Sequence, residues 1–234
     1  MPVITMTGTV ASGAREVGRR VATLLGIDFV DQQLMVQAAK RCGVPVGVVA
    51  ERDERSASFR ERLSGLFGTL LERSAASAAA DPLTGVTGLE AVLSQTYADM
   101  ARETEEKPFS DQLYLDTMST IVKELAESGR IVILGRGSQM ILADEPRALH
   151  VLCVAPRKVR AGRLAEREQL QIEEAKTMAD KTDKARATFY QRLWKVEVED
   201  PRLYDLTVDT SRLPFDDAAE VVALAAQIKS GERA

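Results

Sequence analysis

The chain has 234 residues, enough for one sizeable domain or for a domain with an inserted lobe, and its hydrophobic share of 45% is normal for a globular protein. A formal net charge of −4 argues against a general nucleic-acid-binding protein, because such proteins usually carry a basic surplus. No apolar run approaches the roughly 18 residues that a membrane helix needs. We therefore expect neither nucleic acid nor a membrane as a partner.

The start of the chain and its cysteines indicate a cytoplasmic protein. The opening MPVITMTG lacks the basic region and the cleavage pattern of a secretory signal. Cys42 and Cys153 have no metal-type spacing, so reduced and mostly buried thiols are expected. His150, the single histidine, lies in an apolar run and is expected to fill the core rather than to serve a Ser-His-Asp or metal mechanism. No metal-ligating residue is predicted.

The first part of the chain alternates between strands and helices. A short apolar strand is predicted over residues 3–7, followed by a helix over 14–25 whose apolar residues share one face and which ends at Gly26. A second brief strand is predicted over 28–30. Asp31 then begins a further helix that runs to about residue 40.

Residues 43–107 have a different character and predict a helical insertion. They contain a charged run, an alanine and serine tract and a turn-rich stretch, with no strand pattern. Their apolar helical stretch carries Leu63, Leu66, Phe67, Leu70 and Leu71. These are too many apolar side chains for a solvated segment, so they are expected to pack on the core or on a second chain. We expect a homodimer formed through this lobe.

The alternation resumes at Ser110, which is a plausible N-cap. Helices are predicted from Ser110 to Gly129, from Pro156 onward, over 172–193 and over 215–230, and strands over 131–134, 149–154 and 206–208. Five short apolar strands alternating with helices predict a three-layer α/β fold around a parallel five-stranded sheet. The core then comprises residues 1–42 and 108–234, and ligands are expected at the carboxyl ends of the strands.

The stretch TGTVASGARE, residues 7–16, lies between the first strand and helix, where a phosphate-binding loop belongs. Gly8 and Gly13 have the P-loop spacing, and glycines allow successive N–H groups to point at an anion near a helix N-terminus. Ala14 stands where the usual lysine would be, so we predict that Arg15 supplies the positive charge. The predicted phosphate site is Gly8, Thr9, Ser12, Gly13, Ala14, Arg15 and Glu16. The alternative is a tight turn without a ligand.

Arginines follow two other strands. Arg136 lies between two glycines after a buried strand, where it can be presented to a cleft or can form a structural pair with a carboxylate. Arg160, Arg163 and Arg167 share one side of a helix. Phosphoryl transfer needs cations over the transferring group, which suits this arrangement, but a charged helical face can also simply be solvated. Arg157 lies off that face and is expected in solvent.

The remaining candidates also have structural alternatives. Asp183 and Arg186 are three residues apart on a helix and can form a surface salt bridge. Asp31 can be the N-cap of the helix that it begins. Tyr190 and Trp194, near the end of the long helix, are expected to be core anchors rather than stacking platforms.

Together these segments resemble the cytidylate kinase-like family, a P-loop branch near the bacterial cytidylate kinases. The matching stretches, in the family's order, are ITMTGTVASGAREVGRRVATLLGIDFVDQQLM, IVILGRGSQMILADEPRALHVLCVAPRKVRAGRLAERE, DKARATFYQR and YDLTVDTSRL. The resemblance implies a nucleoside-monophosphate-kinase fold with a lid near 157–193 and an acceptor-binding region. It also implies ATP and Mg²⁺ as cofactors and a small nucleotide as partner.

The resemblance assigns roles to individual residues. Gly8, Ser12 and Gly13 match the loop that holds the donor phosphates, and Arg136 matches an arginine that contacts the acceptor phosphate. The acceptor-side residues that it implies are Asp31, Arg136, Asp183 and Arg186. The resemblance also implies lid arginines, which correspond to Arg160, Arg163 and Arg167. Together with Arg15, which the loop pattern suggests, they are the predicted catalytic cations.

The chain also departs from the cytidylate kinases. They have lysine in place of Ala14, threonine in place of Glu16 and aspartate in place of Gly137. The cytidylate kinase-like family commonly lacks that lysine and keeps an Arg-Glu pair such as Arg15-Glu16. Ala11 and Ala14 replace glycines of the family's pattern, and a positive φ at Ala11 would cost roughly 1 kcal/mol.

Two functions therefore stay open at the level of sequence. The first is ATP-dependent phosphoryl transfer to a nucleoside monophosphate, as in cytidylate kinases, or to a similar small acceptor. The second is a non-catalytic nucleotide- or anion-binding regulatory protein that retains the kinase fold. The arginines and Asp183 favour the first function, and the missing lysine favours the second.

Overall fold

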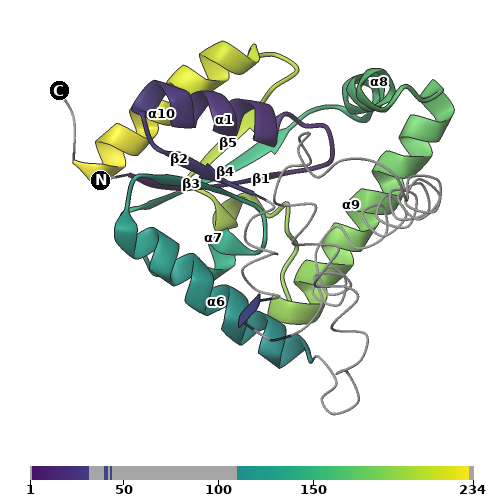
Figure 1. Ribbon diagram of the computed structural model, residues 1–234. Helices are drawn as coiled ribbons and strands as arrows, with labels where there is room; N and C mark the ends of the chain where they lie inside the picture. The colour runs from purple at the N-terminus through teal and green to yellow at the C-terminus, as the bar shows by residue number, and fades with distance from the viewer. Residues whose placement is uncertain (1, 32–39, 42, 44–109, 232–234) are drawn as a thin grey trace, which may run out of the picture.

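The computed structural model describes residues 2–31, 40, 41, 43 and 110–231 (Figure 1). The strands are β1 (Val3–Gly8), β2 (Asp28–Val30), β3 (Ile131–Leu134), β4 (Ala148–Val154) and β5 (Leu206–Asp209). The helices are α1 (Ala14–Leu25), α6 (Asp111–Ser128), α7 (Ser138–Ile141), α8 (Arg157–Glu168), α9 (Ile172–Trp194) and α10 (Phe215–Ser230), with a 3₁₀ turn, η1 (Pro201–Leu203). The predicted elements within these ranges are present, whereas α7 and η1 were not predicted.

The five strands form one sheet in the order β2-β3-β1-β4-β5, and each pair is parallel. Strand β1 lies in the middle, with Val3 opposite Ile131 of β3 on one side and Ala148 of β4 on the other. Val3 and Ile4 are fully buried although they point to opposite faces, because helices cover both faces of the sheet. This confirms the predicted three-layer α/β class.

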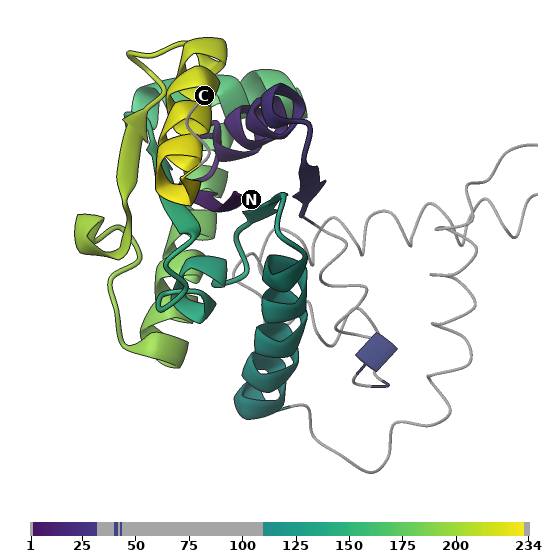
Figure 2. The same ribbon diagram turned by 90° about the vertical axis from the view of Figure 1, so that its left-hand side faces the viewer.

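Helices α1 and α10 lie side by side on one face of the sheet, as the two views show (Figures 1 and 2). Their apolar faces form a core with β1 and β4, in which Val17, Val21 and Val222 are fully buried. On the other face, α6 and the end of α9 form a second core around Tyr114 and Phe189. The central sheet is thereby fixed between two apolar layers.

Local capping explains why several helices begin and end where predicted. Ser110 Oγ accepts a hydrogen bond of 3.1 Å from the Leu113 N–H at the start of α6. Gly26 and Gly231 end α1 and α10 in left-handed conformations, which glycine adopts without steric cost. The expected core role of His150 is confirmed, since it is buried with Nδ1 2.7 Å from Thr5 Oγ1.

Several predictions concern residues outside the described ranges. They are the helix after Asp31, the buried thiol of Cys42, and the helical lobe within residues 43–107 with its role in dimerisation. For residues 2–31 and 110–231, the structure contains no helix with the length and apolarity needed to cross a membrane. The same part of the chain holds no group of three His, Cys, Asp or Glu side chains arranged to bind a metal.

Candidate functional site

The carboxyl ends of the strands gather the predicted site residues at one edge of the sheet. The loop of residues 9–13 follows β1, Asp31 follows β2, Arg136 follows β3, and two residues separate the end of β4 from the start of α8. Because all strands are parallel, these segments leave the sheet on the same side. The strand-end argument from the sequence therefore placed the segments correctly.

The loop after β1 is a tight turn that depends on small residues. Ser12 N–H donates to Thr9 O at 3.0 Å, and Ala11 and Gly13 have φ angles of 57° and 90°. A Cβ at Gly8 would lie 2.3 Å from Ser12 Oγ, so a side chain there would fill the turn. The left-handed Ala11 is the strained position that the sequence suggested, at a cost of roughly 1 kcal/mol.

The N-terminus of α1 offers a place for an anion. The first N–H groups of a helix have no acceptor within the helix, and the N-cap, Gly13, has no side chain to cap them. The helix dipole adds partial positive charge at this end. In the part of the chain that the structure describes, the buried Ser12 Oγ has no hydrogen-bond partner. A nucleotide phosphate fits these groups.

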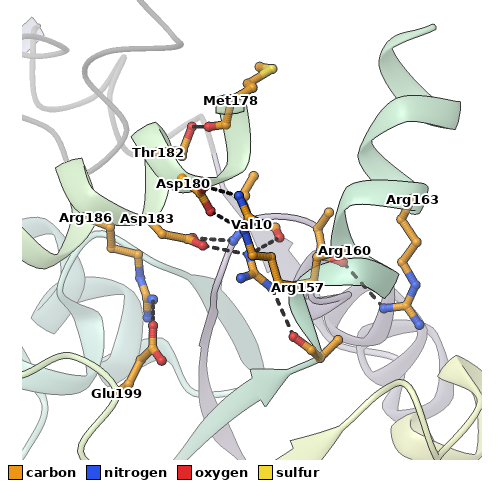
Figure 3. Close-up of polar contacts among 12 residues, drawn as sticks. Val10, Arg157, Arg160, Arg163, Met178, Asp180, Thr182, Asp183, Arg186 and Glu199 are labelled. Carbon is orange, nitrogen blue, oxygen red and sulfur yellow. Dashed lines mark hydrogen bonds and ion pairs between the residues drawn. The ribbon is translucent and has the colours of Figure 1, made fainter. Parts of the chain in front are cut away.

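Helices α8 and α9, which form the predicted lid, contact the same loop (Figure 3). Asp183 Oδ1 accepts a hydrogen bond of 2.9 Å from the Val10 N–H, and Arg160 Nη1 donates to Val10 O at 3.2 Å. Arg160 Nη1 also lies 2.6 Å from Asp183 Oδ2, and Arg160 Nε donates to Ala155 O at 3.0 Å. Arg160 is 8% exposed. The two members of this ion pair between α8 and α9 therefore bond to both backbone polar groups of Val10, Asp183 to the N–H and Arg160 to the carbonyl oxygen.

Arg163 is held in a similar way one turn further along α8. Its Nη1 donates to Thr210 Oγ1 at 2.8 Å, and its Nη2 donates to Thr210 O at 2.7 Å. Thr210 Oγ1 in turn donates to Ser12 O at 2.6 Å, which connects the loop after β1 with the segment after β5. The guanidinium lies 4.7 Å from the ring centre of Phe215, a cation–π contact.

The predicted arginine face of α8 thus divides into two parts. Arg160 and Arg163 point to the loop and bond to backbone oxygens, whereas Arg167 is 44% exposed and pairs with its neighbour Glu168. Arg157 is 55% exposed, as expected for a residue in solvent, and its Nε donates to Asp180 of α9 at 2.8 Å. In this conformation the two inward arginines stabilise the lid against the loop.

The second group of charges surrounds Asp31. This carboxylate, 6% exposed, forms an ion pair with Arg15 and lies 3.9 Å from Arg136 Nη2. Arg136 is 2% exposed, whereas Arg15 is 35% exposed. Among the described residues, this group of two arginines and one aspartate carries a formal charge of +1, which suits a bound phosphate. The structural pairing considered as the alternative for Arg136 is therefore present.

Asp183 and Arg186 take separate partners rather than pairing with each other at the surface. Arg186 is 5% exposed, and its Nη2 donates to Thr7 Oγ1 at 3.0 Å. Its Nη1 lies 4.0 Å from Glu199 Oε1, and its guanidinium centre is 5.8 Å from the Tyr190 ring. The surface salt bridge considered from the sequence is thus wrong, because both side chains turn toward the strand ends.

Sequence reasoning missed two contributors to this edge, Thr7 and Thr210. Each is the polar residue at or just after the end of a strand, the same signal that identified Asp31 and Arg136. A threonine attracts less attention than a charged residue, although its hydroxyl can orient an arginine. Cys153 is not a nucleophile candidate, because burial, with the nearby charge of Glu16, raises the pKa of its thiol to about 12.

A parallel sheet with a glycine loop after its central strand and an arginine-bearing lid defines a P-loop kinase-like α/β protein. The chain belongs to the cytidylate kinase-like family, whose model matches residues 3–212. This confirms the resemblance inferred from the four sequence stretches.

Curated relatives named cytidylate kinase match parts of the chain. The protein from Methanopyrus kandleri is 32% identical over 111 residues, which are 44% of this chain and 58% of that protein. The protein from Haloquadratum walsbyi is 27% identical over 157 residues, covering 64% and 82% of the two chains. The one from Methanothrix thermoacetophila is 32% identical over 130 residues, covering 55% and 70%.

A solved structure of an uncharacterized protein from Eubacterium ventriosum resembles nearly the whole chain. The TM-score is 0.63 at 16% identity, with 97% of this chain and 99% of that chain covered. At this identity the likeness concerns the fold alone. The family and the fold together support a nucleotide kinase-like protein.

Proposed function

We propose that the protein transfers a phosphoryl group from ATP to a nucleoside monophosphate, with cytidylate as the first candidate, or to a similar small acceptor. One observation carries this proposal: the positive group of Arg15, Asp31 and Arg136 lies at the same sheet edge as the uncapped N-terminus of α1. Two anion-binding features at one edge suit a donor and an acceptor phosphate. The family supports the same reaction.

In the proposed reaction an oxygen of the acceptor phosphate attacks the γ-phosphorus of ATP, and the bond to the β–γ bridging oxygen breaks to release ADP. Charge spreads over the equatorial oxygens in the transition state, so cations and N–H groups that face it lower the barrier. Arg136 is placed to orient the acceptor, and Arg15 lies between the two anion features. Positioning of this kind supplies much of the catalysis.

Mg²⁺ accompanies the nucleotide in this proposal. Protein sites usually hold Mg²⁺ through one or two carboxylates together with substrate phosphates. Glu16, in the first turn of α1, supplies a carboxylate next to the proposed donor site. We expect ATP affinity to depend strongly on Mg²⁺, because Glu16 otherwise repels the phosphates.

The second candidate is a nucleotide- or anion-binding protein without catalysis. The observation that favours it is the pairing already made by the lid: Arg160 and Arg163 bond to protein oxygens, and Asp183 occupies the Val10 N–H. Ala14 also removes the lysine that commonly reaches the phosphates. Catalysis would need the lid to exchange these contacts for contacts with a nucleotide.

A coupled assay of ADP release against a panel of monophosphates, beside a calorimetric ATP titration with and without Mg²⁺, separates the two candidates. Turnover with one acceptor establishes the kinase. Binding of ATP without turnover on any acceptor establishes the non-catalytic binder. Absence of both from a folded sample would contradict the kinase and leave the second candidate, with a ligand other than ATP.

Variants of the site assign the roles. Arg136→Ala should weaken monophosphate binding by about 1.5 to 3 kcal/mol, the range for a hydrogen bond to a charged group. Arg147→Ala is the matched control, because Arg147 pairs with Glu145, is 50% exposed and directly precedes β4, at the amino ends of the strands and not at the carboxyl ends. Arg15→Ala should abolish triphosphate binding, and Ala14→Lys should strengthen it. Unchanged affinity in both Arg136→Ala and Arg15→Ala would remove these residues from the site.

A further inference from the structure

The turn that carries Arg136 has an unusual backbone. Gly135, Arg136 and Gly137 have φ angles of 71°, 63° and 70°, three left-handed residues in succession. Non-glycine residues seldom adopt this conformation, and they keep it only where the surroundings enforce it. Backbone bonds hold the two ends of the turn: Gly135 N–H donates to Met6 O at 2.8 Å, and Ser138 N–H donates to Gly135 O at 3.1 Å.

The indole of Trp194 covers the third residue of this turn. A Cβ at Gly137 would lie 2.2 Å from Trp194 Cη2 and 2.8 Å from Cζ2, closer than real side-chain contacts allow. The far edge of the ring therefore rests on the backbone of the glycine. Trp194 itself is packed against Phe189 and Tyr190, with ring centres 5.6 Å and 5.3 Å away. Two aromatic neighbours therefore support the ring beside the turn.

Trp194 is the last of four residues on one face of α9, and this face lies along the carboxyl ends of the strands. Asp183, Arg186, Tyr190 and Trp194 are spaced so that they share one face of the helix. In that order they contact the Val10 N–H, Thr7 Oγ1, Gln139 Oε1 and Gly137. Helix α9 thus contacts both the loop after β1 and the turn at Arg136.

We propose that Trp194 is a positioning residue for Arg136. Its ring fixes Gly137, and so keeps the left-handed turn in the form that places the Arg136 guanidinium 3.9 Å from Asp31. Trp194 acts through the turn and need not touch the ligand. The inference rests on the proposed function only for the nature of the ligand, a monophosphate.

The test compares two substitutions in the same aromatic cluster of the full chain. Trp194→Phe removes the part of the ring that touches Gly137. Tyr114→Leu disturbs the same cluster at a residue that is 1% exposed, and the ring contact of Tyr114 is with Phe189, 5.9 Å away, so the substitution leaves both aromatic neighbours of Trp194 in place. Cytidine monophosphate and ATP with Mg²⁺ are the calorimetric probes, and thermal unfolding reports stability.

We expect both variants to lower the unfolding midpoint, since both disturb a buried cluster. Only Trp194→Phe should weaken binding of the monophosphate, by about tenfold as for a lost hydrogen bond to a charged group, with ATP affinity within about twofold of the parent. Equal losses of monophosphate affinity in the two variants, or no loss in Trp194→Phe, would overturn the proposal.

If the parent binds no monophosphate, the proposed function fails, and a double-mutant cycle still decides the positioning role. Trp194→Phe and Arg136→Met are measured singly and together by chemical denaturation. If Trp194 holds the turn, the effects of the two substitutions on the unfolding equilibrium constant should not be additive. The double variant should then differ from the additive expectation by about fivefold or more. Additive effects would show that Trp194 does not position Arg136.

Discussion

The backbone strain of the loop after β1 depends on single residues in left-handed conformations. Ala11 holds φ at 57°, a region in which its methyl group crowds the backbone, whereas Gly13 reaches 90° without that penalty. The loop therefore uses glycine at one left-handed position and alanine at another. Strain of this kind is often kept at functional sites, since the surrounding contacts hold it in place.

Ala11→Gly should raise the free energy of unfolding by about 0.5 to 1 kcal/mol, because relief of the left-handed strain exceeds the added entropy of the unfolded chain. Ala14→Gly is the matched control three residues along, in the first turn of α1. There the same change should lower the free energy by about 1 kcal/mol, as glycine weakens a helix. Urea denaturation measures both, and a loss of stability in Ala11→Gly would contradict the strain.

Helices α8 and α9 are joined to each other and to the loop after β1 by polar contacts. They are joined by a shielded ion pair, Arg160 with Asp183, and by an exposed one, Arg157 with Asp180. The shielded pair also satisfies the backbone of Val10, so it links the two helices to the sheet edge. The exposed pair joins the same two helices without touching the loop.

Asp183→Asn should lower the free energy of unfolding by about 1 to 3 kcal/mol, because it leaves the charge of the buried Arg160 without its partner. Asp180→Asn should have a much smaller effect, since exposed ion pairs are screened by water and salt. Urea denaturation of both variants at low and high salt provides the measurement. Equal losses of unfolding free energy in the two variants would indicate that the ion pair of Arg160 and Asp183 stabilises the protein no more than the exposed pair does.

At the scale of the whole molecule, the parallel sheet buries a single titrating histidine. His150 lies in β4 with Nδ1 against Thr5, and burial lowers the pKa of its imidazole below the usual value of 6.5. The unfolded chain therefore takes up this proton at a higher pH than the folded chain does. The free energy of unfolding should fall as pH decreases through 6.5, until the folded-state pKa is passed.

His150→Asn should flatten this dependence between about pH 5.5 and pH 7, where carboxylates with ordinary pKa values contribute little. Asparagine keeps a polar atom near Thr5 but has no proton to gain. Thermal or urea unfolding across that range measures the slope. A parent protein whose stability is flat there, or a variant with the same slope, would contradict the role of the histidine.

Assembly is a further prediction at this scale. The apolar residues within 63–71 predict a homodimer formed through the lobe of residues 43–107, which lies outside the described residues. Light scattering should give the mass of two chains. A monomer at high concentration would contradict the prediction.

Most helices and strands, and the sheet edge at which the candidate site lies, could be predicted from local patterns in the sequence. The bounds of α1, β2, β3 and α10 agree with the pattern, because apolar periodicity and glycine caps are local signals. Helix α7 was missed because four residues are too few for a periodicity. The parallel order of the strands then implied that Asp31 and Arg136 lie at one edge.

The partner of each charged residue could not be predicted from local patterns, because it depends on contacts between distant segments. Asp183 and Arg186, three residues apart on one helix, bind Val10 and Thr7, which lie more than 170 positions earlier in the chain. Trp194 rests on Gly137 for the same reason, since α9 crosses the strand ends. Local spacing specifies which residues can pair within a helix, but contacts between distant segments depend on how the whole chain packs.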